Sequence, residues 1–249
     1  MQLALVIPPK LLAKYESDTD CFFALAQYIE EPGYLDFFRK KLEEGRWVIL
    51  DNGASELGRT IDIQTYFEIT QMAPWSEIVL PDIQFDGIAT AQTHDAFMRL
   101  FHTKRNQHQP MLMAVPQGKN EEEAAMSLGL MASRFGLFTY PHMSIGLPRL
   151  MEGYAVEVGS GPEVRVGIAC DLMAERPNTP VHFLGAGPNI FESAKAALRA
   201  GVRSIDTGRM FGPDKNGEGL VYTKAVIDEL RRELARAASE AAEASAGQV

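Results

Sequence analysis

Short apolar runs alternate with longer amphipathic stretches along this chain. The clearest run, Trp47 to Leu50, ends in Asp51 and breaks at once into Asn52 and Gly53. Because the run is too short for a helix and turn-forming residues follow it, we predict a buried strand with an acid at its carboxyl end. The same pattern predicts further strands at 3–7, 77–82, 111–115, 142–146, 181–185 and 202–206.

Helical patterns occupy the stretches between these runs. A helix is expected from Asp18 or Asp20, which would cap it, through Phe22 and Ile29 to a stop at Pro32. Asn120, followed three residues later by Glu123, resembles a capping box. The other expected helices cover 35–44, 62–72, 86–101, 121–135, 163–175, 191–200 and 223–236.

The alternation of strands and helices predicts parallel βαβ units, and strand ends that recur roughly every 20 to 40 residues are typical of a (β/α)8 TIM-like barrel. Only seven strands are recognisable, so the pattern also fits an irregular or incomplete barrel. A doubly wound open sheet is the alternative, although no GxGxxG motif follows an early strand. We expect one barrel domain over 1–236 and a frayed tail over 237–249.

Composition narrows the function classes. The 249 residues carry a formal net charge of -9, which argues against binding nucleic acid through a broad basic surface but leaves a local basic groove open. Cys21 and Cys170 form no CxxC or Cys/His cluster, so neither a disulfide framework nor a cysteine-built zinc site is expected, and a cytoplasmic setting fits. The N-terminal apolar run is too short to span a membrane and lacks a basic leader, so it predicts a first strand.

In a barrel, the carboxyl ends of the strands meet at one face, where active sites lie. Acids and amides placed there describe a pocket for a polar, flat ligand, because carboxylates accept from N–H groups or act as acid, base or nucleophile. Each acid could instead merely cap the next helix, and His142 and His182 fit structural roles better than metal binding. The expected site comprises Asp51, Asn52, Asp82, Gln117, the backbone of His142 to Ser144, Leu184, Gly185, Asp206 and Arg209.

One set of segments, in order along the chain, resembles the tRNA-guanine transglycosylase superfamily, most closely its short phage-type members that resemble DNA-guanine transglycosylases. The likeness covers roughly residues 3–212 and is carried by LDNGASE, LPDI, VPQG, SIGL, HFLGAG and SIDTG. It implies a barrel pentosyltransferase, in the cytoplasm and possibly phage-encoded, that exchanges guanine in nucleic acid for a free 7-deazaguanine base without a cofactor.

The resemblance also implies roles for the site residues. Asp206 would be the nucleophile that forms a covalent glycosyl-enzyme, and Asp51 the general acid/base. The base would be bound by Asp82, by Gln117 and by the backbone of His142 and Met143. Leu184 and Gly185 would pack on its face, and Asn52 and Arg209 complete the expected binding residues.

The chain departs from that family in two places. It lacks the Cys/His zinc site of the tRNA enzymes, so DNA is the preferred partner over tRNA, and Ser55 stands where the family has an aromatic residue. Two other readings stay open: a barrel aldolase or phosphate-binding isomerase, and a non-catalytic binding subunit. The lack of a strand-end lysine disfavours a Schiff-base aldolase. The presence of both Asp51 and Asp206 disfavours the binding subunit. Whether the chain forms a homodimer stays open.

Overall fold

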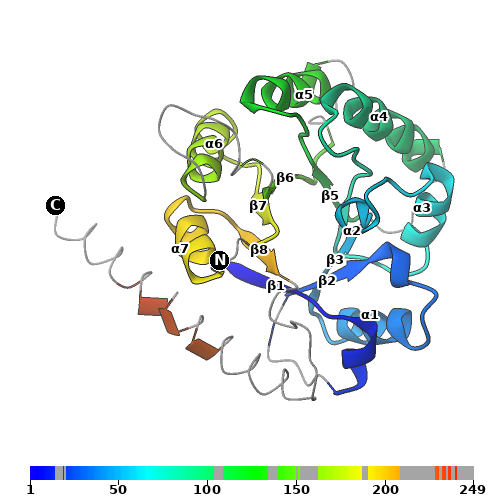
Figure 1. The fold of residues 1–249 in the computed structure, drawn as a ribbon. Helices are drawn as coiled ribbons and strands as arrows, with labels where there is room; N and C mark the ends of the chain where they lie inside the picture. The colour runs from blue at the N-terminus through cyan, green and yellow to red at the C-terminus, as the bar shows by residue number, and fades with distance from the viewer. Residues whose placement is uncertain are drawn as a thin grey trace.

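The computed structural model describes residues 1–14, 19, 21–103, 109–133, 140–149, 151, 162–186 and 190–207, and isolated residues between 228 and 239. Figure 1 shows a ring of strands surrounded by helices. Each strand pairs in parallel with the next, and β1 pairs with β8, so the sheet closes on itself as a (β/α)8 barrel. The predicted fold class is therefore confirmed, and the doubly wound open sheet is excluded.

The barrel strands are short, as is usual for this fold. They are β1 (Gln2–Val6), β2 (Cys21–Leu25), β3 (Trp47–Asp51), β4 (Glu77–Val79), β5 (Met111–Ala114), β6 (Met143–Pro148), β7 (Val181–Leu184) and β8 (Ser204–Thr207).

The strand that the sequence pattern did not reveal is β2, and the helix expected through Phe22 and Ile29 was wrong. All five residues of β2 are buried, and the strand lies in register between β1 and β3, where Phe23 pairs with Val6 and Ile49. A strand covered on both faces reads as a continuous apolar run, which periodicity cannot distinguish from a buried helix. Among the described residues from Cys21 to Ile29, the helical structure is one 3-10 turn, η2 (Ala26–Tyr28).

The outer layer consists of helices that follow the strands. One of them begins at an expected cap, Asn120, which accepts the backbone N–H three residues ahead at 2.9 Å, and Asp62 and Asp86 do the same at the starts of two others. Most of the helix expected at 223–236, and of the tail at 237–249, lies outside the described residues. The helices are η1 (Pro9–Lys14), α1 (Tyr34–Glu43), α2 (Ala54–Leu57), α3 (Ile63–Thr70), α4 (Gly87–Thr103), α5 (Glu121–Ser133), α6 (Pro162–Glu175) and α7 (Ile190–Arg199).

Side chains alternate between the barrel interior and the layer under the helices. Leu50 packs in the large cluster beneath the helices, whereas Ile49 belongs to the cluster that includes Ala4 and Met113 on other strands. Because successive residues of a strand point to opposite faces, Asp51 faces the same way as Ile49. Asp51, at the carboxyl end of β3, therefore faces the interior of the barrel.

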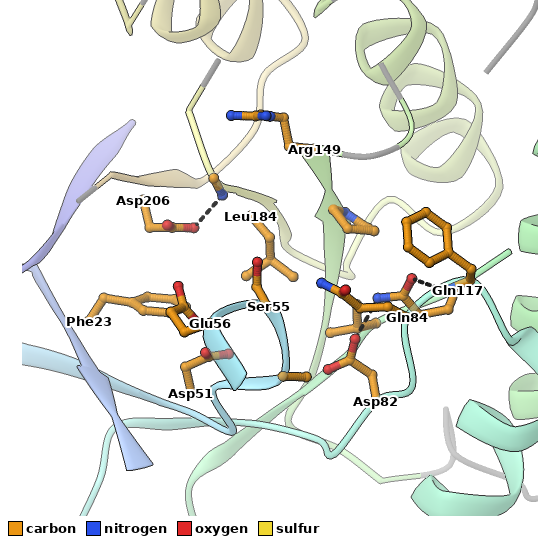
Figure 2. Close-up of a pocket in the computed structure, with 15 residues that line it drawn as sticks. Phe23, Asp51, Ser55, Glu56, Asp82, Gln84, Gln117, Arg149, Leu184 and Asp206 are labelled. Carbon is orange, nitrogen blue, oxygen red and sulfur yellow. Dashed lines mark hydrogen bonds between the residues drawn. The ribbon is translucent and has the colours of Figure 1, made fainter. Parts of the chain in front are cut away.

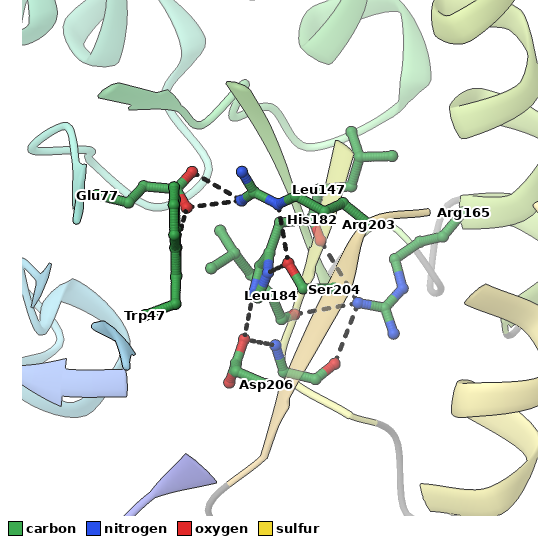
Figure 3. Close-up of polar contacts among 10 residues, drawn as sticks. Trp47, Glu77, Leu147, Arg165, His182, Leu184, Arg203, Ser204 and Asp206 are labelled. Atoms are coloured by element: carbon green, nitrogen blue, oxygen red, sulfur yellow. Dashed lines mark hydrogen bonds and ion pairs between the residues drawn. The ribbon is translucent and has the colours of Figure 1, made fainter. Parts of the chain in front are cut away.

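A buried ion pair lies among the amino ends of the strands. Glu77, at the start of β4, is fully buried and accepts from Nη2 of Arg203 at 2.6 and 2.9 Å (Figure 3). The indole Nε1 of Trp47 donates to the same carboxylate at 3.1 Å, and the Ser144 hydroxyl donates to its other oxygen. The guanidinium of Arg203 also lies over the Trp47 ring. This cluster joins β3, β4, β6 and the start of β8.

No helix in the described part of the chain is both long and apolar enough to cross a membrane.

Candidate active site

A cavity of about 340 Å³ opens at the carboxyl ends of the strands. Figure 2 shows Asp51 and Asp206 toward the same side of it as Phe23, and Asp82 with Gln117 on the other side. A volume of this size suits a small molecule. The lining residues are Phe23, Asp51, Ala54, Ser55, Glu56, Asp82, Gln84, Phe85, Val115, Gln117, Pro148, Arg149, Leu184, Gly185 and Asp206.

Asp51 is held by the turn that follows it. Its Oδ2 accepts from the backbone N–H of Gly53 at 2.9 Å, and the Oδ1 of Asn52 accepts from Ala54 at 2.9 Å. The chain turns here because Gly53 has φ of 71°, a conformation that glycine adopts without strain. The turn leads into the short helix α2, so Asp51 and Asn52 each cap backbone groups as well as standing at the cavity.

Three polar side chains bridge the ends of β3, β4 and β5. Asn52 Nδ2 donates to Oδ1 of Asp82 at 2.8 Å and to the Leu80 carbonyl at 3.0 Å, and Gln117 Nε2 donates to the other oxygen, Oδ2, of Asp82. Oε1 of Gln117 in turn accepts from the Phe85 backbone at 3.4 Å. All three side chains are buried, so each amide fixes one oxygen of Asp82.

Asp206 lies on β8, the strand that pairs with β1 and closes the barrel. Its Oδ1 accepts from the backbone N–H of Gly185 at 2.8 Å and lies 3.1 Å from Nε2 of His182. The carboxyl group is 10% exposed, and it faces the cavity. Oδ1 of Asp206 therefore has two nitrogen neighbours, one in the His182 ring and one in the backbone of Gly185.

The other three acids of the site have raised pKa values. Burial raises the pKa of Asp51 well above its usual range, and the nearby charges of Glu56 and Asp82 raise it further. Burial also raises the pKa of Asp82, against the opposing effect of the Asn52 and Gln117 hydrogen bonds. The pKa of Glu56 is raised too, first by desolvation and then by Asp206 and Asp82. Asp51, where burial and charge act together, is the acid of the cavity whose pKa rises well above its usual range.

Most of the predicted site residues come together. Asp51, Asp82, Gln117, Leu184, Gly185 and Asp206 line the cavity, and Asn52 lies behind it, bonded to Asp82.

His142 and Met143 are the exceptions, and their expected place was wrong. They lie where β6 begins, at the amino end of the barrel, whereas the cavity opens at the carboxyl ends of the strands and β6 reaches it at Pro148. Pro148 and Arg149 occupy the cavity position instead. Arg209 lies outside the described residues.

Several lining residues did not emerge from the sequence. Phe23 was assigned to a helix, and Gln84 and Phe85 come from a loop without a periodic signal. Glu56 is part of LDNGASE, and its distance of five residues from Asp51 gave no indication that both acids would face the same cavity. Phe85 has a positive φ of 62°, which is unusual for an aromatic residue and is not readable from the sequence.

The side chains that line the cavity limit the reactions that it can support. No lysine is among the described residues that line the cavity, so they offer no amine for a Schiff base. Within the described ranges, no group of three or more His, Cys, Asp or Glu side chains is arranged to hold a metal ion. Four carboxyl groups and a single arginine give the described lining an acidic balance.

Comparisons with known proteins identify similar folds but no family. No family model and no curated protein matches the sequence. Orotidine 5'-monophosphate decarboxylase from Sulfolobus solfataricus is 11% identical, with a TM-score of 0.54 over 94% of this chain and 99% of that one. KGPDC from Streptococcus mutans is 11% identical, with a TM-score of 0.54 over 94% of this chain and 97% of that one. Thiamine phosphate pyrophosphorylase from Pyrococcus furiosus is 13% identical, with a TM-score of 0.52 over 95% of this chain and 96% of that one.

These comparisons overturn the expected membership of the tRNA-guanine transglycosylase superfamily, and with it the predicted exchange of guanine for a 7-deazaguanine. The structural neighbours are other barrel enzymes, and no tRNA-guanine transglycosylase appears among them. A physical reason is that any parallel barrel gathers its strand-end acids at one face, so such an ordered set of acids does not identify a family. DNA, tRNA and a homodimer as partners stay predictions.

Proposed function

We propose that this protein is a barrel enzyme that acts on a small polar molecule by carboxyl-based acid–base catalysis, with Asp51 as the acid and Asp206 as the base. The observation that carries the proposal is the contrast between the two groups. Burial and acidic neighbours raise the pKa of Asp51, whereas Asp206 accepts from two N–H groups through one oxygen. Two carboxyl groups in such different environments can divide the roles of proton donor and acceptor.

The substrate would be uncharged or positively charged and rich in N–H or O–H donors. Asp51, Glu56, Asp82 and Asp206 face the cavity, and Arg149 is the one cation among the described lining residues. A strongly anionic ligand would therefore meet repulsion across most of the cavity. Phe23 and Leu184 provide apolar surface for a flat part of the substrate.

Asp82 would bind the substrate and not exchange its proton with it. Its two oxygens are fixed by Asn52 and Gln117, yet a carboxyl group has further lone pairs that can accept N–H or O–H groups of a ligand. Held from behind by two amides, it would present these lone pairs in a fixed direction. Fixed acceptors of this kind select a ligand by its donor pattern.

The three related barrels in the comparison bear names that include a decarboxylase and a pyrophosphorylase, and two of those names include a phosphate. Identities of 11 to 13% support a barrel enzyme and nothing finer. A phosphorylated substrate is the contrasting expectation, and the test below separates it from ours.

The test begins with ligand-observed NMR on three panels of small molecules: neutral amides and polyols, amines, and phosphorylated sugars. Bound compounds are then incubated with the enzyme in D2O, and deuterium incorporation or breakdown is followed by 1H NMR. We expect ligands from the first two panels, and a loss of turnover of about 10²-fold to 10⁴-fold in Asp51→Asn and Asp206→Asn.

Asp36→Asn is the matched control, because Asp36 lies on α1 with its side chain 81% exposed. It should keep full turnover. The proposal fails if both cavity variants turn over substrate like the wild type, or if only phosphorylated compounds bind in the cavity.

A further inference from the structure

A chain of buried polar side chains runs up the barrel interior to Asp206. Ser204 and Asp206 are two positions apart on β8 and so point to the same face, and Ser204 pairs in register with His182 on β7. Oγ of Ser204 lies 2.7 Å from Nδ1 of His182, and Nε2 of His182 lies 3.1 Å from Oδ1 of Asp206. Figure 3 shows the chain continuing from Ser204, away from Asp206, to Arg203, whose Nε donates to Ser204 at 3.4 Å.

Asp206 sets the direction of the hydrogen bonds in this chain. As the proposed base it is a carboxylate, whose oxygens only accept, so Nε2 of His182 must carry the proton at the 3.1 Å contact with Oδ1. In the neutral ring Nδ1 then accepts from the Ser204 hydroxyl 2.7 Å away. Oγ of Ser204 keeps lone pairs for the Nε–H of Arg203.

We propose that His182 is a positioning residue, held as the neutral Nε2–H tautomer, which anchors Oδ1 of Asp206 and leaves Oδ2 as the oxygen that acts on the substrate. The proposal rests on the proposed role of Asp206 as the base. Both hydrogen bonds to Asp206 go to Oδ1, and within the described part of the chain Oδ2 has none. One oxygen is thus fixed by β7, and the other faces the cavity.

The rest of β7 is built to keep this anchor in place. Nη1 of Arg165, a fully buried residue of α6, donates to the carbonyls of Leu184 at 3.0 Å and Gly185 at 3.1 Å. This holds the turn whose N–H groups include the second donor to Asp206. On the other side, the Phe23 ring stacks on His182 with their centroids 5.8 Å apart and the rings inclined by 16°. Rotation of the imidazole would break contacts on both sides.

The tautomer can be measured without any substrate. Long-range 1H–15N correlation spectra of the 15N-histidine-labelled full chain distinguish Nε2–H, Nδ1–H and imidazolium forms, and His102 and His142 provide exposed references. We expect the Nε2–H form for His182, and a fall of about fivefold in its preference in Ser204→Ala, the effect of one lost hydrogen bond. Ser204→Thr, which retains the hydroxyl, should restore it. An Nδ1–H form or an imidazolium at neutral pH would overturn the proposal.

A second readout uses turnover of whichever ligand the D2O assay identifies. His182→Phe keeps the stacking on Phe23 but removes the donor, so kcat should fall about tenfold or more while KM stays within about threefold. His182→Gln, whose Nε2 can donate to Asp206, should recover part of kcat. An unchanged kcat in His182→Phe would contradict the positioning role. If no substrate is found, the proposed function fails, while the NMR result still decides the proton arrangement of His182.

Discussion

The backbone N–H of Gly53 donates to Oδ2 of Asp51 at 2.9 Å, and a side chain on Gly53 would displace the side chain of Gln27. A Cβ at this position would lie 2.0 Å from Oε1 of Gln27, and φ is 71°. The orientation of Asp51 therefore depends on a glycine.

Gly53→Ala should lower the free energy of unfolding by about 2 to 4 kcal/mol, the combined effect of a left-handed alanine and an overfilled site. Gly58→Ala is the matched control, because Gly58 also has a positive φ, of 64°, but open space around it. It should cost only about 1 kcal/mol. Urea titrations of both variants measure the difference, and equal losses would contradict the role of the Gln27 contact.

Asp51→Asn should stabilise the protein at neutral pH, by about 0.5 to 2 kcal/mol. Burial raises the pKa of Asp51 in the folded chain, whereas the unfolded chain keeps the usual value near 3.8. At a pH between these two values, Asp51 is protonated in the folded chain and ionised in the unfolded chain. Folding stability contributed by this group is therefore full at low pH and declines as pH rises through that window.

Denaturant titrations from pH 4 to 8 measure this effect. The asparagine can still accept from Gly53, so the variant should show a flatter decline of stability with pH than the wild type. Asp36→Asn, on the exposed face of α1, should track the wild type within about 0.5 kcal/mol. A parallel pH dependence of wild type and Asp51→Asn would mean that Asp51 does not retain its proton on folding.

Glu77→Gln should destabilise the fold by about 3 kcal/mol, because it leaves the Arg203 charge without its buried counter-ion. The comparison is Glu163→Gln, which removes another Glu–Arg pair, with Arg199, whose side chains are 65% and 60% exposed. That change should cost less than about 1 kcal/mol. Thermal unfolding of the two variants tests whether burial accounts for the difference.

The barrel and half of its site could be predicted from the sequence because both depend on local signals. Asp51 and Asp82 each follow a short apolar run, and parallel strands bring such positions to one face. The cap at Asn120 was readable for the same reason, since a cap involves residues three positions apart.

What could not be predicted depends on contacts between distant segments. Because β2 is buried on both faces, its sequence shows no alternation of apolar and polar residues. The family resemblance placed His142 and Met143 in the site, although both stand at the start of β6, at the end of the barrel away from the cavity. The contact between His182 and Asp206 depends on the register of β7 against β8, which no local pattern encodes.

The ion pair of Glu77 and Arg203 has a consequence for how the chain folds. These residues are 126 positions apart: Glu77 begins β4, and Arg203 directly precedes β8 on the opposite side of the ring, so neither half of the barrel contains both charges. A half-formed barrel would hold one of them without its partner, which penalises open intermediates. Closure of the ring should therefore be cooperative, with the last strand supplying the counter-charge that the first half of the chain lacks.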